Sequence, residues 1–458
     1  MTAQPLSRAA AGLGTPPPRI VHLGLGAFHR AHQAWYTAQA DDAAGWGIAA
    51  FTGRSPREAE ALTAQECLYT VAARGADGDE VEVVGSIVEA HDGADLGVLR
   101  DLVARPEVAV VTLTVTEAGY RLLPDGAPDL DDSAMAADLA VLRARMGEPV
   151  TPLGRLVAAL DARRRAGAGP IAVVPCDNVP GNGPWVRTGV LALAAATDDA
   201  LAAWVEDHVS FVSTSVDRIT PRRAAGDELL AREAGWIDGS PIVTEPFADW
   251  ILSGEFPAGR PAWESAGARV VDDIEPFEHR KLWMLNGAHS VLASLGRLRG
   301  HATVAEAIAD PVCRELVEDV WDAAARHLPA DVDAAAYRVA LVERFANPRI
   351  VHRLDQIAAD SSVKLAARIA PVARLELGAG GDALPAAAAL GAWIGAVRRC
   401  APVPDARERQ LGDALLSHDP VRALVGVVDP DLASHPQFVA EVRIRAAALA
   451  DVPTTVAP

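Results

Sequence analysis

Short runs of β-branched and other apolar residues, separated by helical stretches, constrain the fold of this chain more than any other feature. Runs of this length are typical of buried strands, and Ala- and Leu-rich segments with helical periodicity lie between some of them. The runs are residues 19–24, 46–51, 108–115, 171–174 and 211–216. Strands that alternate with helices predict a mainly parallel sheet with helices on both faces. Two further segments, 68–71 and 81–84, predict a small antiparallel addition.

The character of the sequence changes near residue 275. Beyond it the Val- and Thr-rich runs disappear, and Ala, Leu, Glu and Arg recur at helical spacing, as in residues 311–328. We therefore predict an α/β domain of Rossmann type over residues 19–277, followed by an all-helical domain over residues 278–458. Residues 1–18, which end in three consecutive prolines, are predicted to form a flexible arm.

Charge and cysteine content exclude several classes of function. The 458 residues include 61 acidic and 42 basic side chains, a formal net charge of −19. This balance argues against a general binder of nucleic acid and against adhesion to an anionic membrane. No apolar run reaches the ~18 residues of a membrane span, and the N-terminus lacks the apolar core of a signal peptide. The four cysteines form no CxxC pair, so no metal site is expected and the protein is predicted to be reduced and cytoplasmic.

A dinucleotide-binding turn is indicated after the first predicted strand. Gly24 and Gly26 stand between that strand and a helical segment; the first would permit a tight turn and the second would let backbone approach a pyrophosphate. His29 takes the place of the usual third glycine, so a plain strand-ending turn explains the pattern equally well. The second strand is followed by Thr52-Gly-Arg54 without the usual ribose-binding carboxylate. Arg54 could contact a 2′-phosphate or the adenine, and the choice between NAD and NADP stays open.

Lysine is rare in this chain. Of the 42 basic residues only Lys281 and Lys364 are lysines. A nucleotide bias towards arginine codons explains the scarcity, but under such a bias a surviving lysine is notable because arginine cannot lose its proton in a protein. Both lysines are therefore candidates for proton transfer.

Polar side chains cluster on a predicted helix at the start of the second domain. Glu278, Lys281, Asn286 and His289 follow one another there, and α-helical spacing places Asn286 about 140° and His289 about 80° from Lys281. A solvated face is the simpler explanation. Leucines interrupt that face, however, and the combination of carboxylate, amine, amide and imidazole is unusual, so the cluster is a candidate catalytic face.

Two more polar clusters follow predicted strands. Asp177, Asn178 and Asn182 come after residues 171–174, and Asp217 comes after residues 211–216. Ligands bind at such carboxyl ends in doubly wound sheets. A turn explains the first cluster equally well, and an ion pair between Asp217 and the following arginine explains the second.

Six motifs, in order, resemble those of the polyol-specific long-chain dehydrogenases, the mannitol dehydrogenase family. The motifs are Gly24-Leu-Gly-Ala-Phe28-His-Arg30-Ala-His32, Thr114-Val-Thr-Glu117-Ala-Gly-Tyr120, Cys176-Asp-Asn178, Val216-Asp217-Arg218-Ile-Thr-Pro221, Glu245-Pro-Phe and Lys281-x4-Asn286-x2-His289. The likeness extends from about residue 19 to 370. It implies a Rossmann-type domain, a helical domain, a metal-independent active site between them, NAD or NADP as cofactor, and a monomer.

The resemblance also implies roles for individual residues. Lys281 matches the general base, Asn178 and Asn286 match amides that hold the reacting oxygen, and Glu278 matches a carboxylate that passes the proton to solvent. His289 and Asp217 match substrate contacts, and Lys364 lies in a segment near the substrate in which Ser361 replaces a common glycine. The residues that match the cofactor site are Gly24, Gly26, Ala27, Phe28, Arg30, Arg54 and Glu117.

These roles agree with the chemistry of alcohol oxidation by a nicotinamide. A base must take the hydroxyl proton, and a lysine amine, with a pKa near 10.4 in water, suits neutral pH only where desolvation or nearby positive charge lowers that pKa. Two amides would stabilise the developing alkoxide without a metal. The expected substrate pair is D-mannitol and D-fructose. Three alternatives stay open: a keto-uronate substrate such as fructuronate, a polyol phosphate substrate, and a dinucleotide sensor without catalytic activity. For a uronate, the cation that binds the carboxylate could be Lys364, Arg353 or Arg368.

Overall fold

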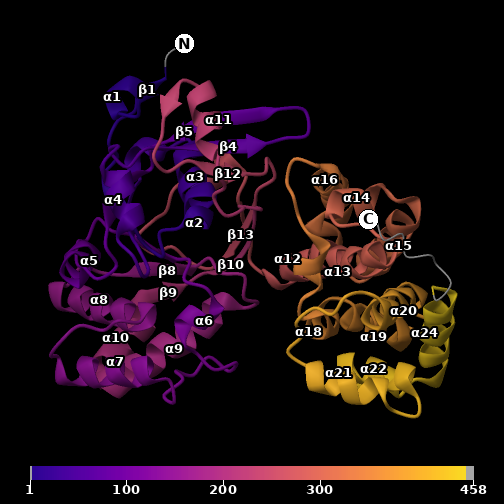
Figure 1. The fold of residues 1–458 in the computed structure, drawn as a ribbon. Coiled ribbons are helices and arrows are strands. Elements are labelled where there is room, and N and C mark those ends of the chain that lie inside the picture. The colour runs from indigo at the N-terminus through magenta and orange to yellow at the C-terminus, as the bar shows by residue number, and fades with distance from the viewer. Residues whose placement is uncertain (1–2, 450–458) are drawn as a thin grey trace. The chain divides into compact units, whose positions relative to one another are not determined.

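The computed structural model describes residues 3–449, which divide into two compact units between Ile274 and Glu275. Figure 1 shows the first in indigo to magenta and the second in orange to yellow. No helix in the described range is long and apolar enough to cross a membrane.

The first unit is built on a six-stranded, wholly parallel sheet. Its order is β6-β3-β2-β7-β8-β9, which is the order of a dinucleotide-binding fold and confirms the predicted class. The strands are β2 (Pro18–Leu23), β3 (Gly47–Phe51), β6 (Ile87–His91), β7 (Val110–Leu113), β8 (Ile171–Pro175) and β9 (Val209–Phe211). The order reverses between β2 and β7, so a crevice for a ligand is expected beside the carboxyl ends of these two strands.

Alternate residues of the strands bury two different cores. One face of the sheet, including Val21 and Val111, packs against helices that lie below it in Figure 1. These are α5 (Leu96–Val103), α7 (Ser133–Ala144), α8 (Pro152–Ala166), α9 (Asn182–Thr197) and α10 (Asp199–His208). The other face, including Ile20 and Val110, packs against α3 (Gln33–Gln39) and smaller sheets.

The smaller sheets include the predicted antiparallel addition. β4 (Tyr69–Arg74) pairs with β5 (Asp79–Val84) in antiparallel register and with β12 (Ile242–Thr244) in parallel register. The predicted strand at 211–216 is wrong as a single element: it divides at Val212 into the end of β9 and β10 (Ser213–Asp217), which joins β13 (Asp249–Ser253) in another sheet. A continuous apolar run does not reveal such a change of sheet.

The N-terminal segment differs from the predicted flexible arm. β1 (Gln4–Pro5) pairs with β11 (Trp236–Ile237), and α1 (Arg8–Ala11) begins at the side-chain cap of Ser7. The Arg8 guanidinium donates to the carbonyls of Gly85 at 3.2 Å and Ile87 at 2.8 Å. These contacts fasten the segment to the domain, and no local sequence pattern indicates them.

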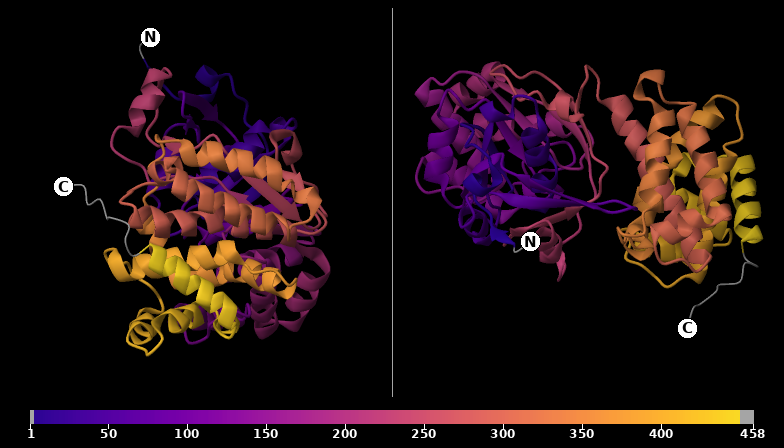
Figure 2. Two further views of the ribbon diagram at one scale, coloured as in Figure 1. Left: turned by 90° about the vertical axis from the view of Figure 1, so that its right-hand side faces the viewer. Right: turned by 90° about the horizontal axis from the view of Figure 1, so that it is seen from above.

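The second unit is helical, as predicted. Among its described residues, 275–449, the structure shows no strand beyond an isolated bridge between Thr303 and Arg353. Figure 2 shows its helices packed against one another, and Figure 1 shows α20 (Leu384–Arg399) beside α24 (Pro436–Ala448). Its longer helices are α15 (Pro311–Ala325), α16 (Ala334–Ala346), α18 (Ser361–Arg368), α19 (Ala370–Gly378), α20 (Leu384–Arg399), α21 (Glu408–Leu415), α22 (Pro420–Val428) and α24 (Pro436–Ala448).

The helix that begins this unit is irregular. It runs from α12 (Glu275–Arg280) through a π-helical turn, η3 (Lys281–Asn286), into α13 (Gly287–Val291) and a second π-helical turn, η4 (Leu292–Gly296). π-Helical turns are rare and are often found at functional sites. This one contains two of the predicted catalytic residues, Lys281 and Asn286.

Candidate active site

The glycine turn lies at the crevice between β2 and β7. Gly24 has a φ of +110°, and a Cβ on it would stand 2.1 Å from the backbone oxygen of Thr114, so only glycine fits there. Gly26 precedes the first residue of α2 (Ala27–Ala31). Bare backbone at Gly24 and the first amides of α2 are what a pyrophosphate requires, so these residues fit a dinucleotide.

His29 accounts for the missing third glycine. Its ring stacks on that of His22 in β2, with centroids 3.3 Å apart and planes within 8°. Both rings are buried. The usual third glycine allows the helix to pack closely on the strand. In this chain the two stacked imidazole rings allow close packing instead. Burial lowers the pKa of His22 to about 3, and burial followed by the charge of His22 holds the pKa of His29 well below its usual value.

This histidine pair predicts an acid-sensitive domain. Below pH 6.5 the unfolded rings take up protons that the folded rings refuse, so the free energy of unfolding must fall as the pH drops, by about 1.4 kcal/mol per pH unit for each proton. His29→Phe keeps the stack and removes one such proton, and should flatten the slope of urea-unfolding free energy between about pH 6 and pH 4. His208→Phe, on a half-exposed ring stacked on Trp204, is the matched control. Equal slopes in both variants would contradict this prediction.

The other predicted cofactor residues occupy varied surroundings. Arg30 is buried, pairs with Glu58 at 3.0 Å and donates to the carbonyl of Ser240 at 2.8 Å. Phe28 is half-buried, and its ring centroid is 5.0 Å from that of His32. Arg54, after β3, and Glu117, at the start of α6 (Glu117–Tyr120), are exposed, and Ala27 begins α2.

A carboxylate that the sequence did not single out lies near the end of β3. Asp92 directly follows β6, and its Oδ1 is 3.4 Å from the hydroxyl of Thr52. The sequence after β3 carries no acid, but the neighbouring strand supplies one at the same edge. The sequence alone could not identify Asp92, because it does not show that β3 and β6 pair. This pairing brings together segments that are about forty residues apart in the chain.

The polar cluster after β8 separates into structural and accessible residues. Asp177 accepts hydrogen bonds from the Thr116 amide at 2.7 Å and the Tyr120 hydroxyl at 2.6 Å, while burial raises its pKa. Asn182 donates to the Thr214 carbonyl and accepts from the Thr214 amide, each at 2.9 Å. Asn178 is exposed at the carboxyl end of the strand. The turn therefore explains Asp177 and Asn182, whereas Asn178 differs from both in its exposure.

Asp217 ends β10 and is half-buried, opposite Asp249 in the strand register. The following residue, Arg218, turns into the domain, where it donates to the carbonyl of Glu245 at 3.1 Å and lies over the Trp35 ring at 4.5 Å. In the described chain the hydrogen bonds of Arg218 go to carbonyls rather than to Asp217. The alternative of a simple ion pair between the two residues is therefore wrong.

The π-helical turn corrects the predicted spacing of the catalytic face. The Gly287 amide donates to the carbonyl of Leu282, five residues earlier. A helix closed by such bonds turns less per residue than an α-helix, so residues five apart lie nearer to one line. Lys281 and Asn286, both half-buried, are five residues apart, so in a π-helical turn they are expected nearer to one side of the helix than the about 140° of α-helical geometry.

Cationic groups gather around His289. Its buried ring lies 4.8 Å from that of His352 and 4.9 Å from that of Phe345. Burial, and then the charges of His352, Arg344, Arg368 and Lys364, hold the pKa of His289 well below its usual value, so the ring is neutral at pH 7. A neutral imidazole can donate and accept one hydrogen bond each, which suits contact with a hydroxyl.

Arg368 and Lys364 come from one face of α18, which packs on α13. Arg368 Nη1 donates to the Asn286 carbonyl at 3.3 Å and to the Ser290 hydroxyl at 3.2 Å. Lys364 Nζ donates to the Ile357 carbonyl at 3.0 Å. Arg353, the third cation predicted for this role, is exposed and its guanidinium pairs with Asp355.

A possible metal-ligand group begins five residues after η4, where the His301 amide donates to the Gly296 carbonyl. Atoms of His301, Asp310 and Cys313 lie within 4.8 Å of one another. The same Asp310 oxygen accepts from Arg299 Nε at 2.5 Å and contacts His301 Nε2 at 2.8 Å. The guanidinium already neutralises this carboxylate, which disfavours a cation there.

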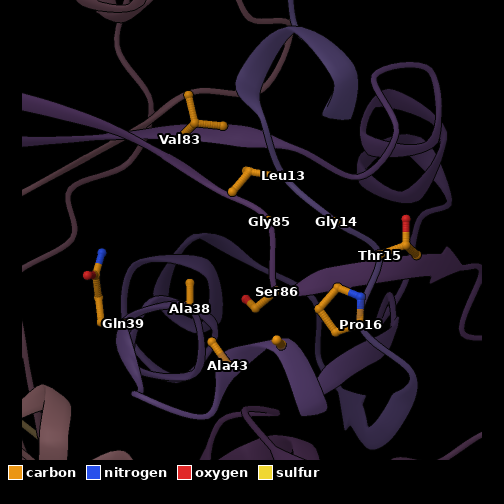
Figure 3. Close-up of a pocket in the computed structure, with 11 residues that line it drawn as sticks. Leu13, Gly14, Thr15, Pro16, Ala38, Gln39, Ala43, Val83, Gly85 and Ser86 are labelled. Carbon is orange, nitrogen blue, oxygen red and sulfur yellow. The ribbon is translucent and has the colours of Figure 1, made fainter.

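The cavity in Figure 3 lies at the edge of the sheet opposite the glycine turn. Its volume is about 360 Å³, and its lining includes Pro16, Ala43 and Ser86. These residues precede β2, β3 and β6, respectively, and so mark the amino-terminal ends of the strands. The cavity is therefore separate from the predicted cofactor turn.

The fold and the glycine turn define a dehydrogenase of the dinucleotide-binding class, and comparison with known proteins agrees. The model of the mannitol dehydrogenase Rossmann domain matches residues 18–265, and that of the mannitol dehydrogenase C-terminal domain matches residues 273–449. The chain belongs to the mannitol dehydrogenase family. It is accordingly an oxidoreductase of the polyol and sugar-acid dehydrogenases, which act on a CH–OH group with NAD.

Relatives with different named substrates resemble this chain. It is 42% identical to D-mannonate oxidoreductase of Escherichia coli over 82% of this chain and 79% of that protein. The structure of Pseudomonas fluorescens mannitol 2-dehydrogenase in complex with NAD and D-mannitol is 32% identical, with a TM-score of 0.77 over 96% of this chain and 93% of that one. A substrate-free D-sorbitol dehydrogenase is 27% identical, with a TM-score of 0.90 over 99% and 100% of the two chains.

Proposed function

We propose that this protein is an NAD-dependent dehydrogenase of a sugar acid, an aldonate such as D-mannonate, which it converts to the keto-uronate. The observation that carries this choice of substrate is the positive charge around His289. Arg368 and Lys364, both from α18, are among the charges that lower the pKa of this ring. A neutral polyol has no group that would compensate such charge, whereas a carboxylate does.

Of these cations, Arg368 favours an anionic substrate most directly. It is largely buried, and its burial lowers its pKa to about 10. Within residues 3–449 no carboxylate pairs with it, and Nε and Nη2 contact no acceptor. Asp360 and Asp405 partly offset the charge of Lys364, whereas no carboxylate among the described residues does so for Arg368. A buried guanidinium without one favours an anionic ligand, held by charge-assisted hydrogen bonds.

The proposed chemistry uses the residues of the π-helical turn. Lys281, as the free amine, takes the proton of the reacting hydroxyl, and Glu278 passes that proton to solvent. The amides of Asn178 and Asn286 donate to the oxygen on which charge develops. His289 and Asp217 contact other hydroxyls. NAD, held at Gly24, Gly26, Ala27, Phe28, Arg30, Arg54 and Glu117, supplies the hydride acceptor.

Oxidation of D-mannitol to D-fructose is the second candidate. The likeness to a mannitol 2-dehydrogenase bound to NAD and D-mannitol favours it. Both candidates require the same base and amides, so only the cations distinguish them. Asp92 near the end of β3 supports NAD over NADP, since a carboxylate would repel a 2′-phosphate. Exposed Arg54 favours NADP instead, since a guanidinium would attract that phosphate.

The discriminating experiment follows NADH absorbance with D-mannonate, D-mannitol, D-arabinitol and D-sorbitol, each with NAD and with NADP. We expect D-mannonate with NAD to give the highest kcat/KM. A higher value for D-mannitol would overturn the sugar-acid proposal and favour the second candidate. Tight NAD binding without turnover of any substrate would indicate a dinucleotide sensor.

A pair of variants tests the cations directly. Lys364→Gln should lower kcat/KM for D-mannonate roughly tenfold, because a charge-assisted hydrogen bond contributes about 1.5 kcal/mol, and should leave the value for D-mannitol unchanged. Arg353→Gln is the matched control, because exposed Arg353 is already paired with Asp355, and should change neither. Equal losses for the acid and the neutral polyol in Lys364→Gln would contradict a carboxylate contact.

A further inference from the structure

The π-helical turn needs hydrogen-bond donors from outside the helix. When bonding shifts from four to five residues, carbonyls inside the turn no longer have their regular α-helical partners, and a buried carbonyl must find another donor. The Asn286 carbonyl accepts from Arg368 in α18 at 3.3 Å, in addition to the Ser290 hydroxyl of its own helix at 3.2 Å. The Met284 carbonyl receives the Gly287 amide and a side chain from a distant helix, Trp321.

Trp321 lies in α15 and is fully buried. Its indole Nε1 donates to the Met284 carbonyl at 2.9 Å. The same ring stacks on Phe345, with centroids 6.3 Å apart and planes within 27°, and Phe345 in turn lies 4.9 Å from the ring of His289. One side chain therefore supports both the turn that carries Lys281 and Asn286 and the ring that backs His289.

We infer that Trp321 is a positioning residue: its indole N–H fixes the π-helical turn that aligns Lys281 with Asn286. The expected effect of Trp321 on kcat rests on the proposed function, whereas its expected effect on the stability of the π-helical turn does not. An α-helical repacking of the turn would move Asn286 away from Lys281 around the helix. The hydrogen bond to Met284 opposes that change, because an α-helical turn would return the amide of residue 288 to the same carbonyl.

The test is Trp321→Phe, which keeps an aromatic ring in the core and removes the donor. We expect kcat with the preferred substrate to fall at least tenfold, with NAD affinity and KM changed little. The pH at which kcat reaches half its maximum should also shift, because the base is no longer held in one environment. Amide hydrogen exchange over residues 284–289 should accelerate.

Trp263→Phe is the matched control. Trp263 is equally buried, and its indole donates to the Thr37 hydroxyl at 3.0 Å in the first unit. This variant should lose comparable thermal stability while keeping kcat, the pH profile and exchange over residues 284–289. Identical kcat, pH profile and exchange in the two variants would show that Trp321 only fills the core, and would overturn the inference.

Failure of the proposed function gives a different pattern. If Lys281→Ala retains turnover, or if no substrate reacts, the catalytic role of the turn is wrong. The exchange measurement then still decides the positioning role. Accelerated exchange in Trp321→Phe alone would support it, and unchanged exchange would overturn it.

Discussion

Lys281→Ala is expected to lower kcat by roughly 10²–10⁴, the usual contribution of a general base, with NAD affinity unchanged. The hydroxyl proton must leave before or with the hydride, and no other side chain of the π-helical turn offers an amine. Steady-state NADH formation measures the loss, and a calorimetric NAD titration measures the affinity. Near-normal turnover would remove Lys281 from the mechanism.

The chain offers a matched comparison because it contains only two lysines. Lys281→Arg should be almost as inactive as Lys281→Ala, since arginine keeps its proton. Lys364→Arg should retain most activity on a sugar acid, since its proposed role requires charge rather than deprotonation. If Lys281→Arg were as active as Lys364→Arg, both lysines would act as cations only.

The second large effect is expected from the two amides. Asn286→Ala and Asn178→Ala should each lower kcat by about 10²–10³, the cost of removing one donor to a developing oxyanion. Asn286→Asp should be at least as harmful, because a carboxylate cannot donate and repels the alkoxide. KM should change less than kcat, since the interaction strengthens as charge develops.

Asn182→Ala separates catalysis from stability. Its amide is buried and bonded to Thr214 on both sides, so its loss leaves backbone groups unsatisfied and should lower the free energy of unfolding by about 1–3 kcal/mol. Asn178 is exposed, so Asn178→Ala should lower the free energy of unfolding less than Asn182→Ala does. Thermal unfolding distinguishes the two, and a destabilised Asn178→Ala of normal kcat would reverse the assignment.

Much of the fold could be predicted from local pattern. The apolar run at residues 171–174 predicted a strand that the structure shows as β8. The change in composition near residue 275 predicted the start of the helical unit, which begins at Glu275. These features depend on periodicity and on apolar content, which the sequence shows directly. The break at Val212 and the docking of Arg8 depend on tertiary contacts, which no local pattern contains.

The candidate site was only partly predictable for the same reason. The order of Lys281, Asn286 and His289 indicated a catalytic helix, but the α-helical angles did not anticipate a π-helical turn, whose Met284 and Asn286 carbonyls accept hydrogen bonds from the distant Trp321 and Arg368. The sequence offered Arg353 and Arg368 as equal candidates for a carboxylate. Only the structure shows that Asp355 holds the first.

The pH dependence of kcat/KM tests the central claim most directly. For wild-type enzyme oxidising D-mannonate, the account predicts a limb that rises with pH by one proton, as Lys281 becomes the free amine. In Lys281→Ala that limb should vanish from the residual activity. An identical limb in Lys281→Ala would show that another group loses the proton, and would contradict the account.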